Sequence, residues 1–285
     1  MKTVQTILFP TDFSETAQNA FRYCLRVADA YQAKIELLHV IYPEYEVMDI
    51  PVMAMKATQD KSEAAKEALQ SFVDLSLVQV QAAYQLRRAP SINSKVEIGD
   101  PVSVIAKVAR RDHADLIVMG TKGRHNVLEK VFGSVTTGII ARAHCSVWVI
   151  PEEATYNAIN IVAYATDLQE TDPYHIWKVS QLLEVFNPIM HCVHVQLPGA
   201  DNGQLNISEL EMFFTTHAPT LQIQFHNLKG ASVYERLEEF ADTYDVEVLA
   251  MYAPHHNLLE RIFYQSTTRK MALQTRIPLF LYRTV

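Results

Sequence analysis

Residues 119–137 read Met119-Gly120-Thr121-Lys122-Gly123-Arg124-His125-Asn126-Val127-Leu128-Glu129-Lys130-Val131-Phe132-Gly133-Ser134-Val135-Thr136-Thr137. Half of the chain's 8 glycines lie at positions 120, 123, 133 and 138. An apolar run that ends at Met119 predicts a buried parallel strand, and residues 134–143 predict a helix. The glycines therefore lie where a strand ends and a helix begins. Free backbone amides at such a junction can bind an anion, and glycine lets a phosphate come close.

The same alternation of strands and helices extends over the whole first half of the chain. Helices are predicted to start at residues 11–15 and at Pro101, and to cover residues 57–85 and 134–143, whereas residues 42–57, with two Pro and three Met, predict an irregular loop. The pattern predicts a parallel sheet with helices on both faces. The strands are expected at residues 6–10, 34–40, 92–98, 115–119 and 146–150.

The second half of the chain repeats the first. Thr166-Asp167-Leu168-Gln169-Glu170-Thr171 resembles Thr11-Asp12-Phe13-Ser14-Glu15-Thr16, and His194 follows Asp167 at the same distance as His39 follows Asp12. Leu259-Glu260-Arg261-Ile262-Phe263 likewise resembles Leu128-Glu129-Lys130-Val131-Phe132, and the last strand, 278–282, matches 146–150. Several segments agree in order and spacing, so we expect two tandem α/β domains, residues 1–151 and 156–285.

Composition excludes several classes of protein. The net charge of -7 argues against a general nucleic-acid binder, which usually carries a basic face. The three cysteines are far apart and form no C-x-x-C pair, which predicts buried free thiols and a reducing, cytoplasmic compartment. No signal peptide and no stretch long enough to span a membrane is apparent, so no membrane partner is expected.

The spacing Gly120-x-x-Gly123, nine residues, Gly133-Ser134 resembles the ATP-binding signature of the universal stress protein family. The first strand and its aspartate, Pro10-Thr11-Asp12, also resemble the start of that family's domain. Neither the P-loop pattern nor G-x-G-x-x-G is present. The resemblance covers residues 1–151 fully and the second copy more weakly. It implies two Rossmann-like domains of the adenine nucleotide α-hydrolase type, each a mostly five-stranded parallel sheet with helices on both faces.

The resemblance also implies a role for each matching residue. Asp12, after Pro10, would contact the ribose or the adenine, and the backbone of Val40 would meet the base. Met119 and Gly120 would line the nucleoside end of the site. The phosphates, with or without Mg²⁺, would be held by Gly123, Arg124, Gly133, Ser134, Val135 and Thr136. The free amides of a helix start, two hydroxyls and the cations Lys122 and Arg124 suit a phosphate on physical grounds as well.

Structural roles compete with these assignments. Asp12-x-x-Glu15 is close to a capping box, with Asp12 as the N-cap, and the second copy keeps Asp167-x-x-Glu170. Lys122 and Arg124 can equally be solvated loop charges. Thr136 and Thr137 recur as Thr267 and Thr268, which favours a structural role for them too.

The second copy lacks the phosphate-binding pattern. Tyr252, His255, Tyr264 and Gln265 stand where the first copy has its three glycines and Ser134, and Pro254 removes a backbone amide. We therefore expect no ATP in residues 156–285. His191, His194, His255 and His256 with Asp167 are the residue types of a zinc site, but their spacing is not diagnostic and no metal is expected.

These observations predict a cytoplasmic, ATP-binding stress-response or regulatory protein that holds its nucleotide in the first domain and forms a homodimer. One alternative is a slow ATP-hydrolysing enzyme of the adenine nucleotide α-hydrolase class, although no nucleophile–base pair and no acidic pair for Mg²⁺ is apparent, so at most weak ATPase activity is expected. The other is an interaction scaffold without a nucleotide. The retained glycines of the first copy disfavour the scaffold.

Overall fold

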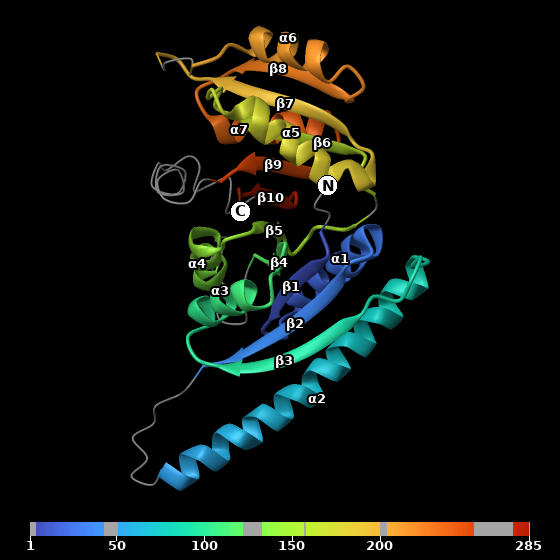
Figure 1. Cartoon of the computed structure of the whole chain (residues 1–285), viewed down its shortest axis with the longest axis vertical. Helices are drawn as coiled ribbons and strands as arrows, with labels where there is room; N and C mark the ends of the chain where they lie inside the picture. The colour runs from blue at the N-terminus through green and yellow to red at the C-terminus, as the bar shows by residue number, and fades with distance from the viewer. Residues whose placement is uncertain are drawn as a thin grey trace. The chain divides into compact units, whose positions relative to one another are not determined.

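The computed structural model describes residues 4–42, 51–121, 133–156, 158–199, 204–253 and 276–284, with only the backbone of residues 51–57. The chain divides into two compact units, Met1–Glu152 and Glu153–Thr284. Each unit is an α/β domain with a parallel sheet (Figure 1). None of the helices in these ranges combines the length and the apolarity needed to cross a membrane.

The sheet of the first unit has the strand order β3-β2-β1-β4-β5, and all of its neighbouring strands run parallel. Helices α1 and α2 pack together on one face, and α3 and α4 pack together on the other. The elements are β1 (Thr6–Thr11), α1 (Glu15–Tyr31), β2 (Lys34–Ile41), α2 (Pro51–Ala83), β3 (Ile92–Ile98), α3 (Pro101–Arg111), β4 (Leu116–Gly120), α4 (Ser134–Arg142) and β5 (Ser146–Ile150).

The second unit has the same strand order, β8-β7-β6-β9-β10, again with parallel neighbours. Strands β6, β7, β8, β9 and β10 therefore correspond to β1, β2, β3, β4 and β5. Its elements are β6 (Ile161–Thr166), α5 (Asp172–Leu183), a 3-10 turn (Glu184–Phe186), β7 (Ile189–Gln196), α6 (Ile207–His217), β8 (Ile223–Lys229), α7 (Val233–Thr243), β9 (Val248–Tyr252) and β10 (Leu279–Tyr282).

Buried strands explain why each sheet is covered on both faces. All five residues of β5 and the first four of β4 are buried, as expected for parallel strands between two layers of helices. On one face Phe9 of β1 packs against Phe21 of α1, with ring centroids 5.0 Å apart. Trp148 of β5, which is fully buried, meets Tyr23 of the same helix. These aromatic contacts fix α1 above the carboxyl half of β1.

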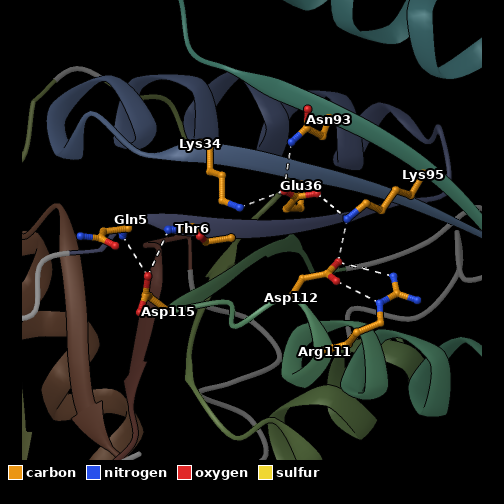
Figure 2. A network of polar contacts seen from close by, with 9 residues as sticks. All are labelled: Gln5, Thr6, Lys34, Glu36, Asn93, Lys95, Arg111, Asp112 and Asp115. Carbon is orange, nitrogen blue, oxygen red and sulfur yellow. Dashed lines mark hydrogen bonds and ion pairs between the residues drawn. The ribbon is translucent and has the colours of Figure 1, made fainter.

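One carboxylate in each unit ties the start of the fourth strand to the start of the first. Asp115 accepts hydrogen bonds from the backbone N–H of Gln5 and Thr6, at 2.9 and 3.1 Å (Figure 2). In the second unit Glu247 accepts from the corresponding amides of Asn160 and Ile161, at 2.5 and 2.7 Å. The repeat recognised in the sequence thus extends to individual hydrogen bonds.

The start of α1 differs from the prediction. Ser14, not Asp12, is the N-cap, and its hydroxyl accepts from the N–H of Ala17 at 3.1 Å. The capping box built on Asp12 and Glu15 was wrong because Phe13 has a φ of 63°, which inserts a turn between the strand and the helix. In the second unit Asp167 and Glu170 form no capping box either, since α5 begins at Asp172.

Helix α2 also starts earlier than predicted. It begins at Pro51, whereas residues 42–57 were expected to be an irregular loop and the helix to begin near residue 57. The proline was interpreted as a loop signal, but at the first position of a helix its missing N–H costs nothing and its φ is already helical. Helix α2 reaches 33 residues, three times the 11 of its counterpart α6.

Candidate functional site

The predicted site residues lie where the strand order of the first unit reverses direction. The chain passes from β1 to β2 on one side, and later returns to β4 on the other side of β1. In open parallel sheets ligands bind beyond the carboxyl ends of the strands at such a point. Thr11 ends β1 and Gly120 ends β4, so the turn after β1 and the segment after β4 leave the sheet at this edge.

The turn after β1 is braced by its own side chains. The Thr11 hydroxyl accepts from the N–H of Phe13, and Asp12 Oδ1 accepts from the N–H of Ser14, both at 3.1 Å. These bonds stabilise the left-handed conformation of Phe13. Asp12 itself is half-buried at this turn.

The histidine that recurs in the repeat connects β2 to this turn. His39 lies beside Thr11 in the strand register, and its Nδ1 is 2.8 Å from the Thr11 carbonyl oxygen. His194 makes the equivalent contact with the carbonyl of Thr166, at 3.1 Å. A carbonyl can only accept, so Nδ1 carries the proton in both rings. The equal Asp-to-His spacing of the two copies thus reflects a structural contact next to Val40, which is half-buried.

Two hydrogen bonds tie the end of β4 to the start of α4, and a third ties it to the end of β5. The Thr136 hydroxyl donates to the Gly120 carbonyl at 3.0 Å, the Gly133 N–H donates to the Thr121 carbonyl at 2.8 Å, and the Thr121 N–H donates to the Ile150 carbonyl at 3.2 Å. Thr136 is only 3% exposed. Its single hydroxyl proton is directed at β4, so this side chain fixes α4 to the strand end.

Within the described part of the chain, the first-turn amides of α4 have no hydrogen-bond partner. Gly133 is the N-cap and has no side chain to cap the helix, and the first amide that bonds back along the helix is that of Thr137, which donates to the Gly133 carbonyl at 3.0 Å. The preceding amides have no intrahelical partner by geometry. Ser134 is exposed and Val135 half-buried at this end. Free amides, the positive end of the helix dipole and an exposed hydroxyl together suit an anion.

Two glycines allow close packing around this junction. A Cβ added to Gly120 would lie 3.1 Å from Cγ2 of Thr16 on α1 and 3.3 Å from its carbonyl oxygen. A Cβ added to Gly138 would lie 2.6 Å from Cγ2 of Val102 on α3, closer than real atoms approach. Gly138 was not assigned a role from the sequence. A glycine inside a helical pattern was the signal that could have identified it.

The remaining predicted residues divide into two groups. Met119 is buried and Pro10 half-buried, each next to the strand end to which it was assigned. Gly123 and Arg124, together with Lys122, lie outside the described residues. The structure therefore brings the turn of Asp12, the end of β4 and the start of α4 to one edge of the sheet.

In the second unit, a tyrosine ring lies where the first unit has Gly120. The registers of β9 with β6 and β10 make Tyr252 the counterpart of Gly120. Its ring stacks on His175 of α5, with centroids 3.5 Å apart and an interplanar angle of 12°. A Cβ added to Gly120 would point to Thr16 on α1. Since α5 corresponds to α1, the Tyr252 side chain fills the equivalent space on the α5 side of its sheet. His255, Tyr264 and Gln265, also expected to block a nucleotide, lie outside the described residues.

The turn after β6 is covered by a later part of its own unit. Leu168, the counterpart of Phe13, keeps the left-handed conformation with a φ of 60°. Its carbonyl accepts from the N–H groups of Gln204 and Leu205, both at 3.0 Å, and the Gln204 side chain accepts from the N–H of Glu170 at 3.3 Å. The chain after β7 therefore folds back over the position that corresponds to the turn of Asp12.

At the first residue of α5, an ionisable side chain replaces an apolar one. Asp172 is 3% exposed and stands where α1 has Ala17. It accepts from the Thr166 hydroxyl and from the N–H of Gln169. Burial raises the pKa of Asp172 to about 6, against the opposing effect of these hydrogen bonds. At neutral pH the second unit therefore holds a buried carboxylate that folding disfavours.

We expect Asp172→Asn to remove a pH dependence of stability. The raised pKa means that the folded state favours the protonated carboxyl group. The resulting contribution to the free energy of unfolding is full below the unfolded pKa of ~3.9 and is lost as the pH rises through about 6. Between pH 5 and 8 the wild type should lose on the order of 1 kcal/mol relative to the variant. Urea unfolding across this range measures the difference. Asp242→Asn, on the exposed side of α7, is the control, and a constant gap between wild type and Asp172→Asn would contradict the assignment.

The histidines considered as metal ligands have other partners where they are described. His191 Nδ1 lies 2.9 Å from His226 Nε2, and His194 contacts the Thr166 carbonyl. Across the described part of the chain, no three His, Cys, Asp or Glu side chains form a group that could hold a metal ion. His255 and His256 lie outside it.

Comparison with known proteins connects this geometry to one family. The model of the Universal stress protein family matches residues 3–151. A relative from Staphylococcus aureus (strain USA300) that carries this family name is 32% identical over 158 residues, which is 54% of this chain and 87% of that protein.

Solved structures resemble both units together. A universal stress protein from Archaeoglobus fulgidus DSM 4304 has a TM-score of 0.72 at 16% identity and covers 99% of this chain and 97% of its own. A functionally unknown protein from Pseudomonas aeruginosa PAO1 has a TM-score of 0.60 at 11% identity, with coverages of 98% and 92%. At these identities the likeness concerns the fold, and it confirms the predicted α/β class with parallel sheets.

Proposed function

This chain belongs to the universal stress protein family, and on that basis we propose that its first unit binds an adenine nucleotide, ATP, at the edge formed by β1, β4 and α4. The observation that carries the proposal is the β4–α4 junction. There a helix begins with a glycine cap, exposes Ser134 and has first-turn amides without a partner among the described residues, while Thr136 ties it to the end of β4. This combination of donors fits a phosphate group.

Each predicted site residue would contact one part of the nucleotide. The free amides of Ser134, Val135 and Thr136, with the Ser134 hydroxyl, would hold the phosphates, and Gly133 keeps that approach free of a side chain. Asp12 would contact the ribose or the adenine, and Met119, Gly120, Pro10 and the backbone of Val40 would line the nucleoside. Gly123 and Arg124 join the phosphate end on the sequence pattern alone. No described residue is assigned to binding Mg²⁺.

We expect the second unit to hold no nucleotide in this way. Two observations support this. Residues 204–205 bond to the carbonyl of Leu168, over the turn that corresponds to Asp12, and Tyr252 stands at the position of Gly120. The second unit would instead act as a structural or regulatory partner of the first. The biological setting we propose is a stress response or regulation in the cytoplasm, by a chain that forms homodimers. The three cysteines, all buried and none in a disulfide, fit a reducing compartment.

Calorimetric titration with ATP and with adenosine tests the phosphate part of the proposal. Contacts to free helix amides contribute only when phosphate is present, so ATP should bind at least tenfold more tightly than adenosine. A tenfold ratio corresponds to about 1.4 kcal/mol, which is modest for charge-assisted hydrogen bonds. Equal affinities for ATP and adenosine would contradict phosphate binding at the β4–α4 junction. If neither compound binds, the proposal that the first unit binds a nucleotide is wrong.

A further inference from the structure

An ionic network around the buried Glu36 joins β2, β3 and the end of α3 in the first unit (Figure 2). Glu36 is 4% exposed and pairs with Lys95 at 2.6 Å and with Lys34 at 3.3 Å, while Asn93 donates to it at 3.1 Å. Lys95 also reaches Asp112, the C-cap of α3, at 2.8 Å. Burial raises the pKa of Glu36, but the bonds from Lys95, Asn93 and Lys34 outweigh it and leave the pKa below its ordinary value.

The second unit has different residues at the same three positions. His39 and His194 correspond, so Glu36, three residues earlier, corresponds to His191. The neighbouring registers pair Leu38 with Lys95 and Val193 with His226, which makes His226 the counterpart of Lys95. Asp112 and Tyr244 cap the ends of α3 and α7. An acid–base–acid network in one unit is thus replaced by two imidazoles and a phenol in the other.

The two imidazoles form a compact contact between neighbouring strands. His191 Nδ1 and His226 Nε2 are 2.9 Å apart, and the rings are stacked with centroids 5.0 Å apart. Phe240 and Tyr244 of α7 close over them, with the Tyr244 centroid 4.9 Å from that of His191 and the Phe240 centroid 4.9 Å from that of His226. His191 is 4% exposed. The pair therefore connects β7, β8 and α7.

No neighbouring carboxylate compensates a positive charge here. In the register of β6, Ala163 lies beside His191, and the titratable group that α7 places against the rings is Tyr244. The α7-end carboxylates Asp242 and Asp245 are exposed, and Glu239 pairs with Arg236. Among the described residues no ion pair to either imidazole is present. Burial lowers the pKa of both histidines, and their proximity lowers that of His191 further.

The hydrogen bond between the rings depends on their protonation. One of the two facing nitrogens must donate and the other accept, so at most one of them carries a proton. If both rings become imidazolium, two N–H groups and two positive charges face each other in a site where His191 is buried and His226 half-buried. A histidine with a lowered pKa in the folded state binds its proton more weakly there than in the unfolded state. Its contribution to the free energy of unfolding is therefore full above the unfolded pKa of ~6.5 and is lost as the pH falls below that value. The Glu36 network of the first unit has no such loss in this range, because the lowered pKa of Glu36 acts only below the ordinary glutamate value of ~4.3.

We propose that the His191–His226 pair makes the β8–α7 edge of the second unit acid-sensitive, so that mild acid opens this edge while the ionic network keeps the β3–α3 edge of the first unit closed. The protein thereby carries a built-in pH response in the unit to which no nucleotide is assigned. This response is independent of whether the first unit binds ATP.

Hydrogen–deuterium exchange of the full chain, read by peptide and corrected for intrinsic rates, tests the proposal between pH 7.5 and 5. A local readout is needed because Asp172 titrates in the same range with the opposite sign. Protection of β8 and α7 should fall at least tenfold, and that of β3 and α3 less than twofold. Unchanged protection of β8 and α7 at pH 5 would overturn the proposal.

Variants assign the effect to the pair. His191→Glu with His226→Lys installs the first unit's ion pair and should abolish the acid-induced loss of protection. If that double variant does not fold, His226→Gln, which keeps a hydrogen-bonding group but cannot be charged, should reduce the loss to less than threefold. His217→Gln, at an exposed histidine of α6, is the matched control and should respond as the wild type does. An acid response that persists in His226→Gln at wild-type size would show that other groups cause it.

Discussion

Ser134→Asp should weaken ATP binding by about 30- to 100-fold while the protein remains folded. The substitution places a carboxylate at the exposed start of α4, where we assign the phosphates. Two like charges ~4 Å apart repel by up to ~4 kcal/mol at an effective dielectric constant of 20, and solvent at this exposed site reduces that to ~2–3 kcal/mol. An acidic residue in the first turn of a helix is itself stabilising by about 0.3–1 kcal/mol. Loss of binding therefore cannot be attributed to loss of the helix.

Two controls isolate the charge. Ser134→Asn has a similar size without the charge and should bind ATP within about threefold of wild type, which is below 1 kcal/mol. Ser232→Asp puts the same charge at the N-cap of α7 in the second unit and should leave ATP affinity unchanged. Calorimetric titration and thermal unfolding of all three variants give the affinities and the stabilities. Equal ATP affinity in Ser134→Asp and Ser134→Asn would contradict the assignment of the phosphates to α4.

Gly138→Ala should destabilise the first unit by about 1–3 kcal/mol, although alanine is the better helix former by nearly 1 kcal/mol. The added Cβ would lie 2.6 and 2.9 Å from the two γ-carbons of Val102. Valine is stiff about χ1 and cannot easily turn away, so α4 has to move from α3. Because α4 carries Ser134 and its free amides, ATP affinity should fall together with stability.

A double variant distinguishes this contact from a general loss of packing. Val102→Ala removes both γ-carbons that the new Cβ would approach. The double variant Val102→Ala with Gly138→Ala should therefore lose less free energy of unfolding than the two single variants lose in total. An interaction of at least 1 kcal/mol in urea unfolding is expected for residues in direct contact. Strict additivity would mean that Gly138 is not needed for the approach of the two helices.

Local sequence patterns were sufficient for most of the fold. Buried runs such as Leu116–Met119 identified the strands, and the repeated Asp-to-His spacing identified the two copies. The identical strand orders of the two units follow from that repeat. What the spacing could not reveal was the purpose of the histidine. The contact of His39 with the Thr11 carbonyl exists only because β1 and β2 are paired in a particular register.

The errors and omissions have different physical causes. Asp12 was interpreted as an N-cap because a capping pattern depends on sequence alone, whereas the left-handed Phe13 moved the cap to Ser14. Pro51 was interpreted as a loop residue, although it is equally suited to start a helix. The role of Gly138 depends on Val102, a residue on another helix. Contacts between distant segments are not visible in local periodicity.

The number of ATP molecules bound per chain tests most directly the claim that only the first unit holds the nucleotide. Calorimetric titration of the full-length wild type should give one site per chain, with all binding lost or strongly weakened in Ser134→Asp. Two equal sites per chain would contradict that claim, as would one site that keeps its wild-type affinity in Ser134→Asp.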